Sequence, residues 1–227
     1  MLPLSLQAFK ASCNSLSLNR TALTNLGQVI KYLNELGLKC PKDQQTCDWI
    51  CPDGVVKPTG ALGNLRNIFH KHVKPKKQHE LYRMGQCCAA ISSATGCKTV
   101  VDVGAGVGHL ARFLSYGHGL KLVCLESVEK FGSAATQLDS QLENACKHLG
   151  ISEFESPKHI TLTLSPNSNN LFELLKPTIQ DTTTIGLIGL HTCGDLGPTL
   201  IRNFAAENYI RFILVIGCCY MKMTIDG

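Results

Sequence analysis

Residues 99–110 decide the fold of this chain, and they read Thr99-Val100-Val101-Asp102-Val103-Gly104-Ala105-Gly106-Val107-Gly108-His109-Leu110. An apolar strand runs into a glycine-rich turn, and the turn runs into a helix. Glycines allow the turn to bend sharply and allow a ligand to approach the bare backbone. The amino end of the following helix offers free N–H groups to that ligand. The stretch therefore predicts a cofactor-binding turn at the carboxyl end of a buried strand.

Two classes of cofactor use this geometry, and the acidic residue before the turn separates them. The dinucleotide pattern G-x-G-x-x-G needs a sixth-position glycine, where this chain has His109. The pattern here is D-x-G-x-G-x-G, with Asp102 two residues before Gly104, and it is typical of S-adenosylmethionine (SAM) methyltransferases. A carboxylate suits the SAM amine, which Asp102 would bind directly or through water, and it would sit poorly beside a pyrophosphate. The sequence therefore favours SAM over a nicotinamide dinucleotide.

A second acidic residue, Glu126, ends the next apolar segment, at residues 121–126. An acid at that place can accept hydrogen bonds from both ribose hydroxyls. The turn and the two acids together favour a nucleoside site over a purely structural turn. The predicted cofactor-binding residues are Asp102, Gly104, Ala105, Gly106, Gly108, His109 and Glu126.

Apolar strands alternate with helices over residues 80–217, which predicts an α/β fold with a parallel sheet and right-handed crossovers. The division into domains places a Rossmann-like domain at 66–227 and a helical or irregular segment at 1–65. The expected strands are 98–103, 121–126, 159–164, 184–190 and 211–217. The expected helices are 80–95, 108–116, 128–149, 170–176 and 198–208.

Composition limits the class of protein and its surroundings. The chain has 227 residues, 44% of them apolar, and 22 Lys and Arg against 17 Asp and Glu, a mildly basic balance that permits an RNA partner. Its 12 cysteines are scattered, which favours reduced thiols in the cytoplasm or nucleus, with the mitochondrion as the alternative. No apolar run reaches the roughly 18 residues of a membrane span. The spacing of Cys40, Cys47 and Cys51 does not fit a closed zinc site, and no metal is expected.

Reactive side chains follow the fourth and fifth strands, where a substrate should approach a parallel sheet. His191 is the best base by its ordinary pKa if the acceptor is a hydroxyl or a ring nitrogen. Helix capping is the alternative for the His191–Asp195 cluster, and small buried thiols are the alternative for the cysteine pair. The predicted acceptor-side residues are His191, Asp195, Cys218, Cys219 and Tyr220.

Residues 66–83 concentrate positive charge, with Glu80 as their single acid. One interpretation is a solvated helix face. The other is an electrostatic approach for an anionic acceptor through Lys74, Lys76 and Lys77.

The sequence resembles the methyltransferase-like protein 25 family, also described as ribosomal RNA adenine dimethylase domain-containing proteins. The resemblance implies a Rossmann-like, class I, SAM-dependent methyltransferase domain, and the His-x-Cys-Gly and Cys-Cys elements are also similar to those of certain tRNA ribose methyltransferases. The stretches that carry it are Lys74-Pro75-Lys76-Lys77-Gln78-His79-Glu80, Val101-Asp102-Val103-Gly104-Ala105-Gly106-Val107-Gly108-His109-Leu110, His191-Thr192-Cys193-Gly194-Asp195-Leu196 and Cys218-Cys219-Tyr220-Met221-Lys222-Met223-Thr224.

The expected function is SAM-dependent methylation of RNA or protein. Adenine dimethylases typically carry an Asn-Pro-Pro-Tyr-like turn where this chain has 191–194, so the acceptor is left open, as is the oligomeric state. A complete methyltransferase sheet has seven strands, and the sequence predicts five. We therefore expect a truncated isoform or fragment that is inactive by itself. The alternative is a degenerate module that acts through a partner without catalysis.

Overall fold

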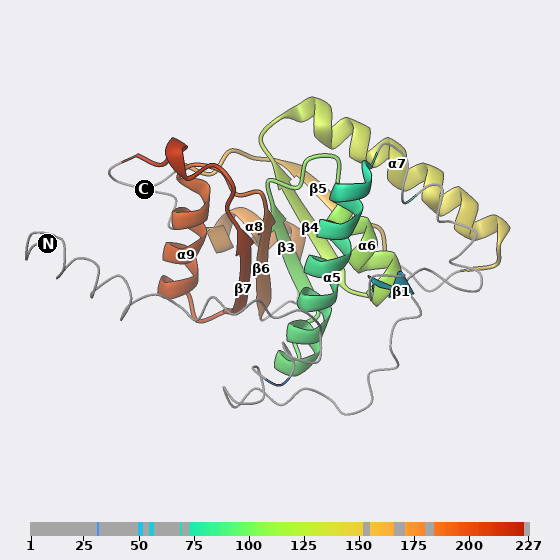
Figure 1. Ribbon diagram of the computed structural model, residues 1–227, viewed down its shortest axis with the longest axis horizontal. Helices are drawn as coiled ribbons and strands as arrows, with labels where there is room; N and C mark the ends of the chain where they lie inside the picture. Colours follow the sequence, from blue (N-terminus) through green and yellow to red (C-terminus); the bar gives the residue numbers. More distant parts are fainter. Residues whose placement is uncertain are drawn as a thin grey trace, which may run out of the picture.

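The computed structural model describes residues 73–151, 155–165, 171–179 and 184–224, together with 31, 50–51, 55–56 and 69. Its centre is a five-stranded parallel sheet in the order β5-β4-β3-β6-β7 (Figure 1). The strands are β3 (Thr99–Val103), β4 (Lys121–Glu126), β5 (Lys158–Thr161), β6 (Ile185–Leu190) and β7 (Ile210–Ile216). The sheet confirms the predicted α/β, Rossmann-like fold class.

The strand order contains one reversal of direction. From β3 the chain adds β4 and then β5 on one side, and it then crosses to the other side of β3 to add β6 and β7. In a parallel sheet the crevice beyond the carboxyl ends of the two strands at such a reversal is the usual ligand site. The topology therefore places the expected site beyond β3 and β6.

Helices cover both faces of the sheet. In the view of Figure 1, α5 lies in front of the sheet and α8 lies behind it. Successive strand residues point to opposite faces, and Val100 and Val101, both 0% exposed, belong to separate core clusters, one with α5 and α6 and one with α8 and α9. The helices are α5 (Pro75–Thr95), α6 (His109–His118), α7 (Glu129–His148), α8 (Leu171–Ile179) and α9 (Leu196–Ala206), and a 3-10 turn, η1 (Tyr220–Lys222), follows β7.

Two helix bounds differ from the sequence expectation by three residues or more, for physical reasons. Helix α5 begins at Pro75 and not at residue 80, because proline at the first helical position loses no hydrogen bond and its φ suits a helix. Helix α8 continues through Pro177 to Ile179 instead of ending at residue 176. Leu175 and Ile179 are buried in the core, and this packing outweighs the hydrogen bond that the proline removes.

The predicted segment 1–65 lies almost wholly outside the described residues. Of it the structure describes a two-residue antiparallel ladder between β1 (Ile50–Cys51) and β2 (Val55–Val56). Within the described part of the chain, no helix combines the length and the apolarity that crossing a membrane requires.

Candidate functional site

A cavity of about 260 Å³ opens at the carboxyl ends of β3 and β6, at the reversal of strand order. The glycine turn forms one wall, α5 contributes a second, and the end of β6 contributes a third. The lining residues are Lys77, Leu81, Asp102, Gly104, Ala105, Gly106, Val107, His109, Leu110, Leu190 and His191.

Two glycines of the turn are required for different reasons. Both have positive φ, +58° at Gly106 and +73° at Gly108, a conformation that favours glycine. A Cβ added at Gly106 would project into open space, so the missing side chain leaves room for a ligand beside the backbone. A Cβ at Gly108 would lie 3.0 Å from Cε1 of His159 and 3.3 Å from Nη1 of Arg112, so this glycine is needed for packing.

The turn is anchored to the end of β4. The N–H of Gly104 donates to the carbonyl oxygen of Leu125 at 2.8 Å, and the N–H of Gly106 donates to Oε2 of Glu126 at 2.8 Å. Oε1 of Glu126 accepts from the N–H of Val128 at 3.0 Å. Glu126 therefore lies behind the turn and does not line the cavity, although its carboxylate keeps accepting capacity for a further partner.

A buried carboxylate and a half-buried ammonium face the same cavity. Asp102 is only 2% exposed, and burial raises its pKa to about 7, with Lys77 acting to lower it and Glu126 to raise it. Burial lowers the pKa of Lys77, and the negative charges of Glu80 and Asp102 oppose that change. Opposite charges are thus held at low solvent exposure on two walls of one cavity.

His191 stands at the rim of the cavity in a strained conformation. Its φ of +68° makes it the single non-glycine residue with positive φ among the residues that the structure describes. Strain of this kind clusters at functional sites. Its Nε2 lies 3.0 Å from Oε2 of Glu80. The other carboxylate oxygen of Glu80, Oε1, lies 3.7 Å from Nζ of Lys76. The pair joins the end of β6 to α5 and presents an imidazole to the cavity.

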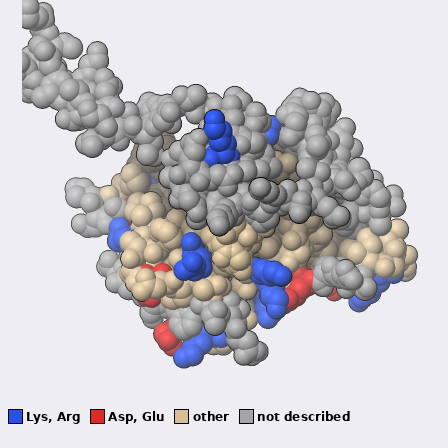
Figure 2. Space-filling view, turned by 90° about the horizontal axis from the view of Figure 1, so that it is seen from below, with Lys and Arg blue, Asp and Glu red and all other residues tan. Residues whose placement is uncertain are grey.

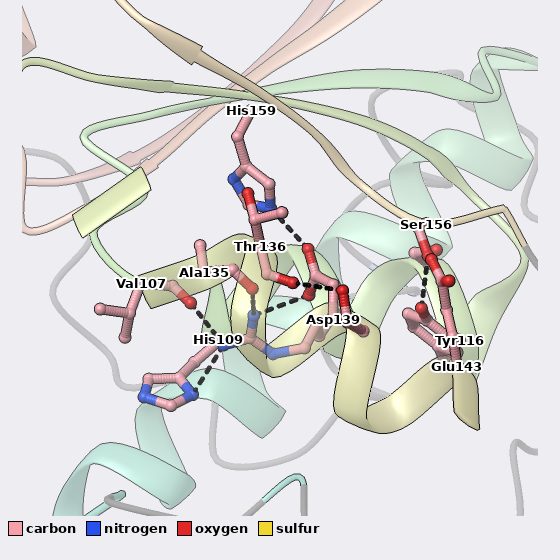
Figure 3. Close-up of polar contacts among 12 residues, drawn as sticks. Val107, His109, Tyr116, Ala135, Thr136, Asp139, Glu143, Ser156 and His159 are labelled. Carbon is pink, nitrogen blue, oxygen red and sulfur yellow. Dashed lines mark hydrogen bonds and ion pairs between the residues drawn. The ribbon is translucent and has the colours of Figure 1, made fainter. Parts of the chain in front are cut away.

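A buried ion-pair network that the sequence did not predict lies behind the turn (Figure 3). Nη1 of Arg112 donates to Oδ1 of Asp139 at 2.8 Å, and Oδ2 of Asp139 lies 2.6 Å from Nε2 of His159. The same guanidinium donates to the carbonyl oxygen of Val107 in the turn and contacts Nδ1 of His109 at 3.3 Å. The network therefore fixes the last residues of the turn from α6, α7 and β5.

The second predicted acceptor-side cluster lies beyond the cavity lining. Sγ of Cys193 lies 3.0 Å from Sγ of Cys218, which lies 3.6 Å from Sγ of Cys219. The contacts with the side chains of Cys218 and Cys219 lower the pKa of Cys193. Tyr220 is 66% exposed.

Asp195 contacts the chain beyond β7. Its carboxylate accepts from the backbone N–H and from the hydroxyl of Thr224, at 2.7 and 3.0 Å. It stands at the N-cap position of α9, but its side chain makes no capping hydrogen bond there. The carboxylate therefore ties two loops together and does not face the cavity.

The structure thus divides the predicted site residues into two sets. Around the cavity it brings together Lys77, Asp102, Gly104, Ala105, Gly106, His109 and His191. Outside the cavity lining it places Lys74, Lys76, Gly108, Glu126, Asp195, Cys218, Cys219 and Tyr220. Sequence could have indicated Arg112 and Asp139, because each is a charged residue on the apolar face of its helix.

A cavity beneath a glycine turn, at the reversal of a parallel sheet, defines a Rossmann-like cofactor-binding domain. The model of the "Methyltransferase domain" family matches residues 76–226, and the chain belongs to that family.

The resemblance to the methyltransferase-like protein 25 family is confirmed by curated relatives. The mouse protein called "Probable methyltransferase-like protein 25" is 35% identical over 73% of this chain and 48% of its own length. The human protein of that name is 38% identical over 22% of this chain and 8% of its own length. The chain thus spans about half or less of the relatives that it matches. A solved SAM-dependent methyltransferase from Aquifex aeolicus is 20% identical, with a TM-score of 0.36 over 66% of this chain and 70% of its own.

Proposed function

We propose that the domain binds SAM in the cavity beneath the glycine turn and transfers its methyl group to RNA or protein. One observation carries the proposal: the buried carboxyl group of Asp102 and the half-buried ammonium of Lys77 line one cavity. The methionine end of SAM is a zwitterion, so it offers an ammonium to Asp102 and a carboxylate to Lys77. Burial strengthens both attractions, and each partner offsets the cost of desolvating the other.

The remaining parts of the cofactor would extend along the turn. The open space beside Gly106 admits a ligand against bare backbone, and Glu126 lies directly behind that residue. We propose that Glu126 accepts a ribose hydroxyl with its remaining lone pairs. Gly108, which the sequence predicts to bind the cofactor, also makes room for His159 and Arg112 through its missing side chain.

Methyl transfer from a sulfonium is an in-line displacement, so the domain must position two reactants and remove a proton from the acceptor where there is one. His191 is the group at the rim that can take that proton, with Glu80 orienting its imidazole from 3.0 Å. This arrangement suits an acceptor group that loses a proton on methylation, such as a hydroxyl or a ring nitrogen.

On one face of the molecule, the described positive charges give limited support to an RNA acceptor. On the face that Figure 2 shows, the described Lys and Arg side chains stand as separate groups, some of them beside acidic side chains. Lys76 is exposed, whereas Lys77 faces the cavity. We therefore propose Lys74 and Lys76 alone as the approach for an anionic acceptor, and Lys77 as a cofactor residue.

Calorimetric titration of the chain with SAM tests the proposal. We expect micromolar binding that is lost in Gly106→Ala, because alanine is strained at a φ of +58° and fills the open space. Lys76→Met is the matched control and should bind normally. Incubation with labelled SAM and total RNA or protein then identifies the acceptor. A folded protein that binds no SAM would instead support the alternative, a methyltransferase fold that acts through a partner without catalysis.

A further inference from the structure

Three cysteines lie together where β6 and β7 end, outside the cavity lining. All three sulfurs lie within 4.8 Å of one another, with Cys193 and Cys218 at 3.0 Å and Cys218 and Cys219 at 3.6 Å. Cys218 is exposed, and the other two are half-buried. The proposed methyl transfer uses none of these thiols, so their clustering requires a separate account.

The pairing of the two strands builds the cluster. Leu190 is opposite Ile216 in the β6–β7 register, and the N–H of Thr192 donates to the carbonyl oxygen of Ile216 at 3.1 Å. The two segments therefore leave the sheet side by side, with Cys193 on one and Cys218 on the other. Backbone hydrogen bonds fix the register, so it does not depend on the thiols.

Further contacts hold the two exit loops against each other. A Cβ at Gly194 would lie 3.0 Å from the carbonyl oxygen of Lys222, which shows how closely the loops approach. The carboxylate of Asp195 accepts from the N–H of Thr224 at 2.7 Å. The three sulfurs are therefore held together by the fold before any ligand arrives.

The three sulfurs lie within reach of one shared metal ion, and Cys193 and Cys218, at 3.0 Å, would move slightly apart to hold it. Thiols are weak donors, so three of them gain little from one another. Tetrahedral zinc binds sulfur at about 2.3 Å, which separates its sulfur ligands by about 3.8 Å. We infer that Cys193, Cys218 and Cys219 bind one Zn²⁺ through three thiolates, with a fourth position open to water or to a lone-pair donor of an incoming acceptor. This departs from the expectation that the chain holds no metal.

The surrounding charge suits the site. Three thiolates and one Zn²⁺ carry a net charge of −1, and two lysines offset it electrostatically, Lys222 near Cys193 and Lys77 near Cys218. A bound ion would lock the ends of β6 and β7 together beside His191. The three-ligand set with an open position is the arrangement of zinc sites that engage a substrate.

The experiment measures zinc directly, without SAM. The purified chain is loaded with Zn²⁺, dialysed and analysed for metal per chain, and Co²⁺ titration reports thiolate ligands through its charge-transfer absorption. We expect one tightly held ion per chain. Cys193→Ser, Cys218→Ser and Cys219→Ser should each weaken binding by more than the roughly 10–100-fold that loss of a supporting group costs.

Two control variants test whether the zinc is bound by the three clustered cysteines and not by other thiols of the chain. Cys87→Ser removes a half-buried thiol on α5 and should keep the ion. The double variant Cys47→Ser/Cys51→Ser removes the pair whose spacing does not fit zinc and should also keep it. The proposal is overturned if the chain binds no zinc, if the three single variants retain zinc, or if only the double variant loses it. A Cys193–Cys218 disulfide that persists after purification under reducing conditions overturns it as well. None of these outcomes depends on whether the domain binds SAM.

Discussion

The N–H of Gly106 and Oε2 of Glu126 lie 2.8 Å apart, although the two residues belong to different crossover units of the fold. This hydrogen bond fixes the one glycine of the turn that faces open space. The same carboxylate bonds the N–H of Val128 at the start of α7. Glu126 therefore sets the position of the turn, and under the proposed function it also offers an acceptor to the ribose.

We predict that Glu126→Ala weakens SAM binding by about 1–3 kcal/mol, because both the ribose acceptor and the support of Gly106 are lost. A 2′-deoxyribose analogue of the demethylated cofactor separates these effects in calorimetry. The native protein should discriminate against the analogue, and the variant should not. Glu129→Gln, at the exposed first residue of α7, is the control and should change neither affinity. Equal SAM affinity in a folded Glu126→Ala protein would contradict the ribose role.

Asp102 predicts an unusual dependence of stability on pH. Its folded pKa of about 7 lies above the ordinary value, so the folded state binds the proton more tightly than the unfolded state does. The free energy of unfolding of the ligand-free protein should therefore decrease as the pH rises from about 4 to 7, by at most about 4 kcal/mol. Asp102→Asn cannot ionise, so it should flatten this slope in denaturant unfolding and also lose SAM affinity. An unchanged slope in the variant would show that other groups cause it.

The buried pair of Arg112 and Asp139 predicts a large stability effect. Without Arg112 the buried Asp139 carboxylate loses its guanidinium partner and keeps only its contact with His159 among the two, so Arg112→Ala should lower the free energy of unfolding by about 3–5 kcal/mol. The exposed pair of Lys121 and Glu155 is the control, and Lys121→Ala should cost less than about 1 kcal/mol. Urea unfolding measures both. Similar small losses in the two variants would mean that the network does not hold the turn.

The sequence predicted the features that local patterns determine. Strands β3, β4, β6 and β7 are largely apolar runs, and the carboxyl ends of parallel strands meet at one edge, so Asp102 and His191 could be placed in one site. Contacts between distant residues could not be predicted in this way. Arg112 and Asp139 are 27 residues apart, and Cys193 and Cys218 are 25 apart, and packing alone brings each pair together.

The orientation of neighbouring charged side chains could not be predicted from sequence either. The sequence shows Lys74, Lys76 and Lys77 as three neighbouring cations, and it does not show which one turns inward. In α5, Lys77 is one helical turn from Leu81, and both line the cavity, whereas the Lys76 side chain is 89% exposed. The start of the helix at Pro75 decides which face each lysine occupies.

We predict that replacing His191 lowers the rate of methyl transfer without weakening SAM binding. His191→Asn tolerates the positive φ better than alanine does, because asparagine more often adopts this conformation. Once the acceptor is known, this variant should lower kcat by about 10²–10⁴-fold, as expected for loss of a general base, with SAM affinity unchanged. Glu80→Gln should give a smaller loss and a shifted pH profile, since it acts through the imidazole. A normal kcat in His191→Asn would exclude the base role.

We predict that Lys77 binds the carboxylate of SAM. The affinity of one variant for SAM alone cannot show which group of SAM Lys77 contacts, so a second ligand is needed. Lys77→Met should weaken SAM binding by about 1–3 kcal/mol and should leave the fold intact, because it removes a charge whose pKa burial already lowers. Decarboxylated SAM isolates the contact. The native protein should bind this analogue more weakly than SAM, and Lys77→Met should bind the two alike, since the group that distinguishes them is gone. Lys76→Met should behave as the native protein does, because its side chain is exposed. If Lys77→Met still discriminates between the two ligands in calorimetry, the carboxylate is bound elsewhere and Lys77 serves to balance the charge of Asp102.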